Sequence, residues 1–119
     1  MKTTVLLLVL AIFAIAQPHP SASLAWNWSQ GTGDPATGFH VQRATTPGGP
    51  YTVVGTVPST ATAVEALTYL DTAVTAGATY YYVVTAYNTA GDSAKSAEVA
   101  CTLPFQIPGS PTNLSGTVK

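Results

Sequence analysis

Charge is scarce in this sequence. Of its 119 residues only 8% are charged, and the formal net charge is −1 at pH 7. Such a chain has no basic field for the phosphates of nucleic acid or for anionic lipid headgroups. We therefore expect no nucleic-acid partner. The length predicts one domain with one hydrophobic core.

Cysteine is also nearly absent. Cys101 is the single cysteine, so the chain cannot form an internal disulfide and its fold must depend on its core. The position of Cys101 suits two interpretations, a small buried hydrophobic side chain or an exposed thiol that forms an intermolecular disulfide. The residues around it do not decide between them.

Groups for metal binding and catalysis are few. The two histidines, His19 and His40, lie far apart, without the ligand spacing of a zinc site. The aspartates Asp34, Asp71 and Asp92 do not clearly reach one end of the fold, which disfavours calcium. Neither histidine has a neighbour suited to activating a nucleophile. We expect no metal, no cofactor and no catalytic residues, and predict a protein that is not an enzyme.

The N-terminus has the pattern of an export signal. Lys2 precedes an apolar run that ends at Ala16, and Ala14-Ile15-Ala16 has the small residues that signal peptidase prefers. We predict that residues 1–16 are removed and that the mature chain begins at Gln17. The alternative, an uncleaved anchor, is disfavoured because a spanning helix needs roughly 20 apolar residues. The prediction is a secreted protein, extracellular or at the cell surface, with no membrane contact after cleavage.

Alternation with a period of two runs through several segments, which is typical of strands with one face in a core. In the clearest segment one face carries Tyr80, Tyr82, Val84 and Ala86, and the other carries Tyr81, Val83, Thr85 and Tyr87. Leu24, Trp26 and Trp28 alternate in the same way. Apolar faces of this kind pack in pairs of sheets, so the pattern predicts an all-β sandwich.

These segments resemble, in order, the strands of a fibronectin type III domain. Val74 to Tyr80 resembles the loop L-x-P-G-x-x-Y before strand F, with Ala76 in place of the proline. The other matching segments are Ser23–Ser29 (strand B), Gly38–Ala44 (strand C), Gly48–Val57 (the next hairpin), Leu67–Val74 (strand E) and Ser93–Pro104 (strand G). The resemblance implies an immunoglobulin-like sandwich of two antiparallel sheets over residues 17–104. It places Trp26 in the core and Tyr80 at the tyrosine corner. Strand A is missing from its usual place before strand B.

Residues 105–119 form a linker and a tail that resembles the missing strand. Within the tail, residues 109–118 follow the family's strand A pattern, P-x-N-L-x-G-x-V, and Leu114, Gly116 and Val118 share one face. Three interpretations stay open: an unpaired remnant of a tandem array, a strand folded back on its own domain, or a strand donated to a second molecule. Donation is heterologous and would generate a filament. Folding back is hindered because strand G should end at the pole opposite to the start of strand A.

The predicted outward residues Tyr81, Val83 and Tyr87 form a candidate platform for a protein or glycan ligand. The alternative is ordinary cross-strand pairing on an exposed sheet. The main prediction is a secreted, non-catalytic module for protein or glycan binding or adhesion. The second is a structural subunit that self-associates by donating residues 109–118.

Overall fold

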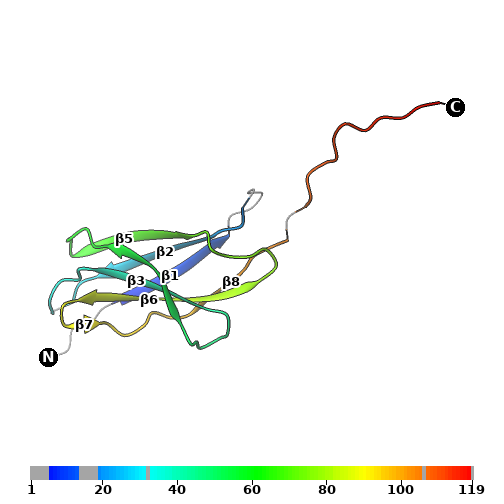
Figure 1. Ribbon diagram of the computed structural model, residues 1–119. Helices are drawn as coiled ribbons and strands as arrows, with labels where there is room; N and C mark the ends of the chain where they lie inside the picture. Colours follow the sequence, from blue (N-terminus) through cyan, green and yellow to red (C-terminus); the bar gives the residue numbers. More distant parts are fainter. Residues whose placement is uncertain (1–5, 14–18, 32, 106, 119) are drawn as a thin grey trace.

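A computed structural model describes residues 6–13, 19–31, 33–105 and 107–118 (Figure 1). These residues form strands and no helix. The strands are β1 (Leu6–Phe13), β2 (Ala22–Ser29), β3 (Gly38–Ala44), β4 (Thr52–Pro58), β5 (Val64–Asp71), β6 (Thr79–Asn88), β7 (Gly91–Asp92) and β8 (Val99–Thr102). The described residues thus contain no helix that could cross a membrane.

Two antiparallel sheets make up the fold. The first has the order β1-β2-β5, and the second has the order β4-β3-β6-β7, with β8 also paired to β6. In the first sheet β2 pairs with β5 from Ala22↔Asp71 to Ser29↔Val64. In the second, β3 pairs with β6 from Gly38↔Tyr87 to Ala44↔Tyr81. The predicted all-β sandwich of two antiparallel sheets is confirmed.

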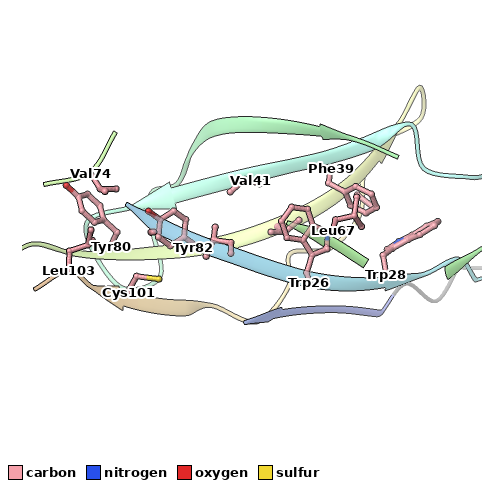
Figure 2. Packing of buried hydrophobic residues seen from close by; sticks show 14 residues of the cluster. Trp26, Trp28, Phe39, Val41, Leu67, Val74, Tyr80, Tyr82, Cys101 and Leu103 are labelled. Carbon is pink, nitrogen blue, oxygen red and sulfur yellow. The ribbon is translucent and has the colours of Figure 1, made fainter. Parts of the chain in front are cut away.

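The core lies between the sheets, where the alternating apolar residues of the strands meet (Figure 2). Towards one end Phe39 of β3 packs edge-to-face against both indoles of β2, with ring centroids 5.9 Å from Trp26 and 5.7 Å from Trp28. Towards the other end lie Tyr80, Tyr82, Cys101 and Leu103. These side chains meet in the core because alternate residues of each strand face the opposite sheet.

The corner before β6 is closed by a tyrosine. The hydroxyl of Tyr80 accepts a hydrogen bond from the backbone N–H of Thr75 at 3.0 Å. The same turn needs Gly77, whose φ of +82° is unfavourable for other residues. A side chain at Gly77 would also collide with the ring of Phe105. The turn and the chain leaving β8 are therefore held together.

One expectation is wrong. The resemblance predicts that strand A is missing before β2, whereas β1 pairs with β2 over eight residues, from Leu6↔Ser29 to Phe13↔Ala22. β1 lies inside the predicted leader, whose continuous apolar run lacks the alternation of apolar and polar residues that indicates a strand. The predicted cleavage site after Ala16 falls outside the described residues and stays a prediction.

The C-terminal tail does not join the sandwich in this structure. Residues 107–118 extend away from the domain (Figure 1) and pair with none of the described strands. The apolar side chains of Ile107, Leu114 and Val118 are almost completely exposed. The predicted donor residues, Leu114, Gly116 and Val118, thus lie where a second molecule can reach them.

Candidate functional site

The outward face of the second sheet carries all three predicted ligand-binding residues, Tyr81, Val83 and Tyr87. The register pairs Gly38 with Tyr87, His40 with Thr85, and Gln42 with Val83, and directly paired residues share one face of a sheet. Tyr81 and Tyr87 are half-buried on this face. We call it the β3/β6 face.

The predicted platform is not continuous, because Val83 is only 2% exposed. Val83 lines a hollow together with residues of two segments distant in sequence, the turn 48–51 and the segment 95–98. Val83 therefore forms part of the floor of a hollow and does not offer a surface between the two tyrosines. Periodicity assigns Val83 to the outward face, but it does not show which loops return over that face.

The hollow has a volume of about 560 Å³. Its lining offers an amide, a phenol, an ammonium and a carboxylate, from Gln42, Tyr51, Lys95 and Glu98, and the remaining residues are Gly48, Pro50, Val83 and Ser96. These groups can donate to and accept from hydroxyl groups or peptide groups of a ligand. The hollow thus combines a small apolar floor with polar walls.

A carboxylate holds the wall of the hollow in place. Glu98 accepts hydrogen bonds from the Tyr51 hydroxyl and, at 2.7 Å, from the backbone N–H of Gly48. The bond from Tyr51, followed by that from Gly48, lowers the pKa of Glu98 below its usual value. The carboxylate is therefore ionised at neutral pH and keeps the 48–51 turn beside the 95–98 segment.

Next to the hollow, His40 stacks on Tyr87. The ring centroids are 4.1 Å apart and the planes differ by 4°. Nδ1 of His40 donates to the Asp92 carboxylate at 2.9 Å, and Thr85 Oγ1 donates to the same oxygen at 2.8 Å. The bond from His40 is the main reason that the pKa of Asp92 is lowered. Thus His40 and Tyr87 form a fixed stacked pair, in which the facing sides of the two rings cover each other.

The hydrogen bonds among His40, Thr85 and Asp92 do not activate the Thr85 hydroxyl as a nucleophile. In a catalytic array the base bonds to the hydroxyl that it activates. Here Asp92 lies between, accepting from both His40 and Thr85, and Thr85 is buried. Within the described ranges, no three side chains of the metal-binding types come together either.

A buried charge cluster at the other end of the sandwich was missed from the sequence. Asp71 is 2% exposed and accepts hydrogen bonds from Arg43 Nη1 at 2.8 Å and Tyr82 Oη at 2.7 Å. Arg43 also donates to the carbonyl of Ala73 at 2.9 Å and lies over the Tyr80 ring. Because these side chains come from β5 of one sheet and from β3 and β6 of the other, the cluster links the two sheets. Arg43 and Asp71 lie on different strands and far apart in the sequence, so no local sequence pattern predicts that they form a pair.

Cys101 belongs to this end of the core. Its side chain is fully buried, and burial, with the nearby Asp71 charge, raises the pKa of its thiol to about 11. A thiol that is protonated and covered is a poor partner for disulfide exchange. The structure therefore favours the packing interpretation of Cys101 over an intermolecular disulfide.

Comparison with known proteins identifies the fold. No protein-family model and no curated protein sequence matches the chain. The chain is similar to a crystallised Fn3-like protein from Clostridium thermocellum, with 31% sequence identity over 71% of this chain and 81% of that chain, and a TM-score of 0.49. It is also similar to the sixth fibronectin type III domain of human fibronectin type III domain containing protein 3, with 20% identity over 85% of this chain and 88% of that chain, and a TM-score of 0.54.

The two similarities carry different weight. The second bears on the fold alone, and it agrees with the two antiparallel sheets described above. The first bears on the family through its sequence identity and its coverage of both chains. The resemblance noted in the sequence is confirmed: the chain belongs to the fibronectin type III family.

Proposed function

We propose that this protein is a secreted, non-catalytic binding or adhesion module whose ligand, a protein or a glycan, contacts the β3/β6 face. The observation that carries the proposal is the hollow of about 560 Å³ beside the stacked rings of His40 and Tyr87. Fibronectin type III domains are generally non-catalytic binding or structural modules and are commonly extracellular. The predicted leader supports the same location.

The chemistry of the face suits a ligand rich in hydroxyl or peptide groups. Flat aromatic rings contact the apolar faces of sugars or of ligand side chains, and amide and phenol groups supply directional hydrogen bonds. Lys95 and Glu98 have opposite charges, so the face carries no field of one sign. A ligand with little net charge therefore fits this face better than a strongly charged polymer.

The binding prediction is tested by the double variant Gln42→Ala/Lys95→Ala. Both side chains line the hollow, and Lys95 is exposed, whereas Gln42 also donates a hydrogen bond to Thr85 at 3.3 Å, so the melting temperature of the variant is measured alongside its binding. Loss of two hydrogen bonds to a ligand should weaken binding about tenfold or more. Affinity electrophoresis in soluble polysaccharides and surface plasmon resonance on immobilised extracellular proteins would measure this.

The matched control is Thr68→Ala. Thr68 is exposed on β5, in the other sheet, and its replacement should leave binding unchanged. A ligand held equally well by the double variant and the wild type would show that the contact lies elsewhere. If the wild-type protein binds none of the polysaccharides and none of the extracellular proteins, that result would argue against a binding module.

A second function, as a structural subunit, is favoured by the tail. Its Leu114 and Val118 are apolar, alternate correctly for one face of a strand, and lie in water. Exposed apolar residues of this kind are costly unless a partner covers them. We propose that one molecule donates residues 109–118 to a sheet edge of the next, which produces head-to-tail assembly.

Deleting residues 109–119 tests the donated strand. In protein purified after export, we expect concentration-dependent oligomers of the chain that begins at Gln17 and a monomer of the same chain without residues 109–119, measured by size exclusion with light scattering. Leu114→Ser/Val118→Ser should act like the deletion, whereas Thr117→Ser, on the opposite face, should not. If truncation changes neither oligomeric state nor melting temperature, the tail is an unpaired remnant.

A further inference from the structure

We propose that β1 and the tail of a second molecule compete for the same edge of β2, so that removal of β1 with the leader is the event that permits assembly. This inference rests on the strand donation proposed above and adds the acceptor edge, its register and its control. The donating segment is residues 109–118 of a second copy of this chain, of which residues 114–118 lie opposite β2.

The edge of β2 is already used in the full chain. β1 is the outer strand of the β1-β2-β5 sheet and pairs with every residue of β2. A sheet edge without its outer strand exposes a row of unpaired N–H and C=O groups, which readily pair with another chain. Residues 6–13 lie entirely within the predicted leader. Export would therefore remove the strand that covers β2.

Chain direction favours a second molecule over the chain's own tail. β1 runs antiparallel to β2 and ends with Phe13 beside Ala22. The chain leaves β8 at this same pole. Thr102 pairs with Thr79 at the start of β6, while Ala22 pairs with Asp71, which in turn holds Arg43 at the end of β3.

The exit point of the tail is held at that pole. The backbone N–H of Gly77 donates to the carbonyl of Leu103 at 2.8 Å, and Phe105 lies against Gly77. From there the tail points away from the domain (Figure 1). To lie directly along its own β2 it would run parallel to that strand, opposite in direction to β1. The tail of a second molecule can enter at the Ser29 end and run antiparallel, as β1 does.

The alternation of β2 sets the register. Leu24, Trp26 and Trp28 face the core, and the residues between them do not. A donated strand that buries its apolar residues would place Leu114, Gly116 and Val118 opposite Trp28, Trp26 and Leu24. Directly opposite side chains crowd each other, and Gly116 leaves room for the Trp26 indole. The outward pairs are then Ser115 with Asn27 and Thr117 with Ala25.

The experiment uses the full chain with a recognition sequence for a site-specific protease inserted between Ala16 and Gln17. Light scattering is measured over a range of protein concentrations, before cleavage and after cleavage with removal of the released peptide in dilute urea. We expect a monomer before cleavage and concentration-dependent oligomers afterwards. Deleting residues 109–119 should abolish the oligomers.

A cysteine pair tests the register in the same material. Asn27→Cys with Ser115→Cys should give disulfide-linked multimers on non-reducing gels after cleavage and none before it. Asn27→Cys with Thr117→Cys is the control, because its Cα atoms would be about 7–8 Å apart, beyond disulfide reach. Cys101 is buried and should not take part.

Three other results of these experiments would each contradict a different part of the proposal. Equal oligomers before and after cleavage would show that β1 does not control assembly, while strand donation stands. Absence of oligomers in both samples would refute donation itself. A disulfide formed within single chains would mean that the tail folds back.

If the protein loses its cooperative melting transition after cleavage, a peptide is added to test whether it restores the fold. A synthetic peptide of residues 109–119 should restore the transition, and the same peptide with Leu114→Ser/Val118→Ser should not. Equal effects of the two peptides, or no effect of either, would show that the tail is not the strand that replaces β1.

Discussion

Replacing Trp26 by alanine should lower the free energy of unfolding by about 3–5 kcal/mol, because it empties the middle of the core. Trp26 is 2% exposed and packs edge-to-face on Phe39 with a centroid distance of 5.9 Å. Its neighbours belong to both sheets, so the space cannot close without moving strands. Urea unfolding followed by circular dichroism measures the loss.

Two milder variants calibrate this result. Trp26→Phe keeps an aromatic ring and removes an indole N–H that has no hydrogen-bond partner among the described residues, so its cost should be smaller. Tyr80→Phe removes only the hydrogen bond with Thr75 and should cost about 1 kcal/mol. A Trp26→Ala loss no larger than that of Tyr80→Phe would contradict the assigned core.

Arg43→Met should cost about 3 kcal/mol, although methionine keeps much of the apolar stem. The variant leaves Asp71, which is 2% exposed, without its cation, and a buried charge that loses its partner is strongly destabilising. This expected loss of free energy is at the low end of the range for breaking a buried ion pair, because the Arg43 side chain is 23% exposed. Chemical denaturation measures the loss.

The double variant Arg43→Met/Asp71→Asn separates charge from packing. Asparagine can still hydrogen-bond with Tyr82 and no longer needs a cation. We therefore expect the double variant to lose less than the sum of the two single variants, as neighbours in one network do. Additive losses would mean that the Arg43–Asp71 ion pair contributes little.

The sequence predicts the strands well where one face of each strand meets the core. In β2 the apolar residues alternate with polar or small ones, and the buried positions are those that the alternation indicates. In β6 the same reasoning fails on one face, because Val83 and Thr85 are buried although the pattern places them outward. Residues of segments 48–51 and 95–98 line a hollow together with Val83, and no local pattern in β6 encodes the approach of those segments.

The contacts that build the candidate site join residues distant in sequence. His40 reaches Asp92, and the 48–51 turn reaches Glu98. Each partner alone is an ordinary surface side chain in the sequence. Only the pairing of β3 with β6 brings these groups to one face. For this reason the sequence indicated Tyr81 and Tyr87 but missed Gln42, Tyr51, Lys95 and Glu98.

By itself, the sequence determined that the chain is all-β, that it resembles a fibronectin type III domain, and that two segments, the predicted leader over residues 1–16 and the tail over residues 109–118, lie outside the strands matched to the domain. Alternation and turn residues are properties of consecutive positions, so they can be read locally. Only the tertiary structure decided that residues 6–13 cover β2 and that residues 107–118 lie free of the sandwich. The backbone groups of a sheet edge accept any strand of suitable shape. Which strand fills that edge therefore depends on chain direction, exit point and competition, and these exist only in three dimensions.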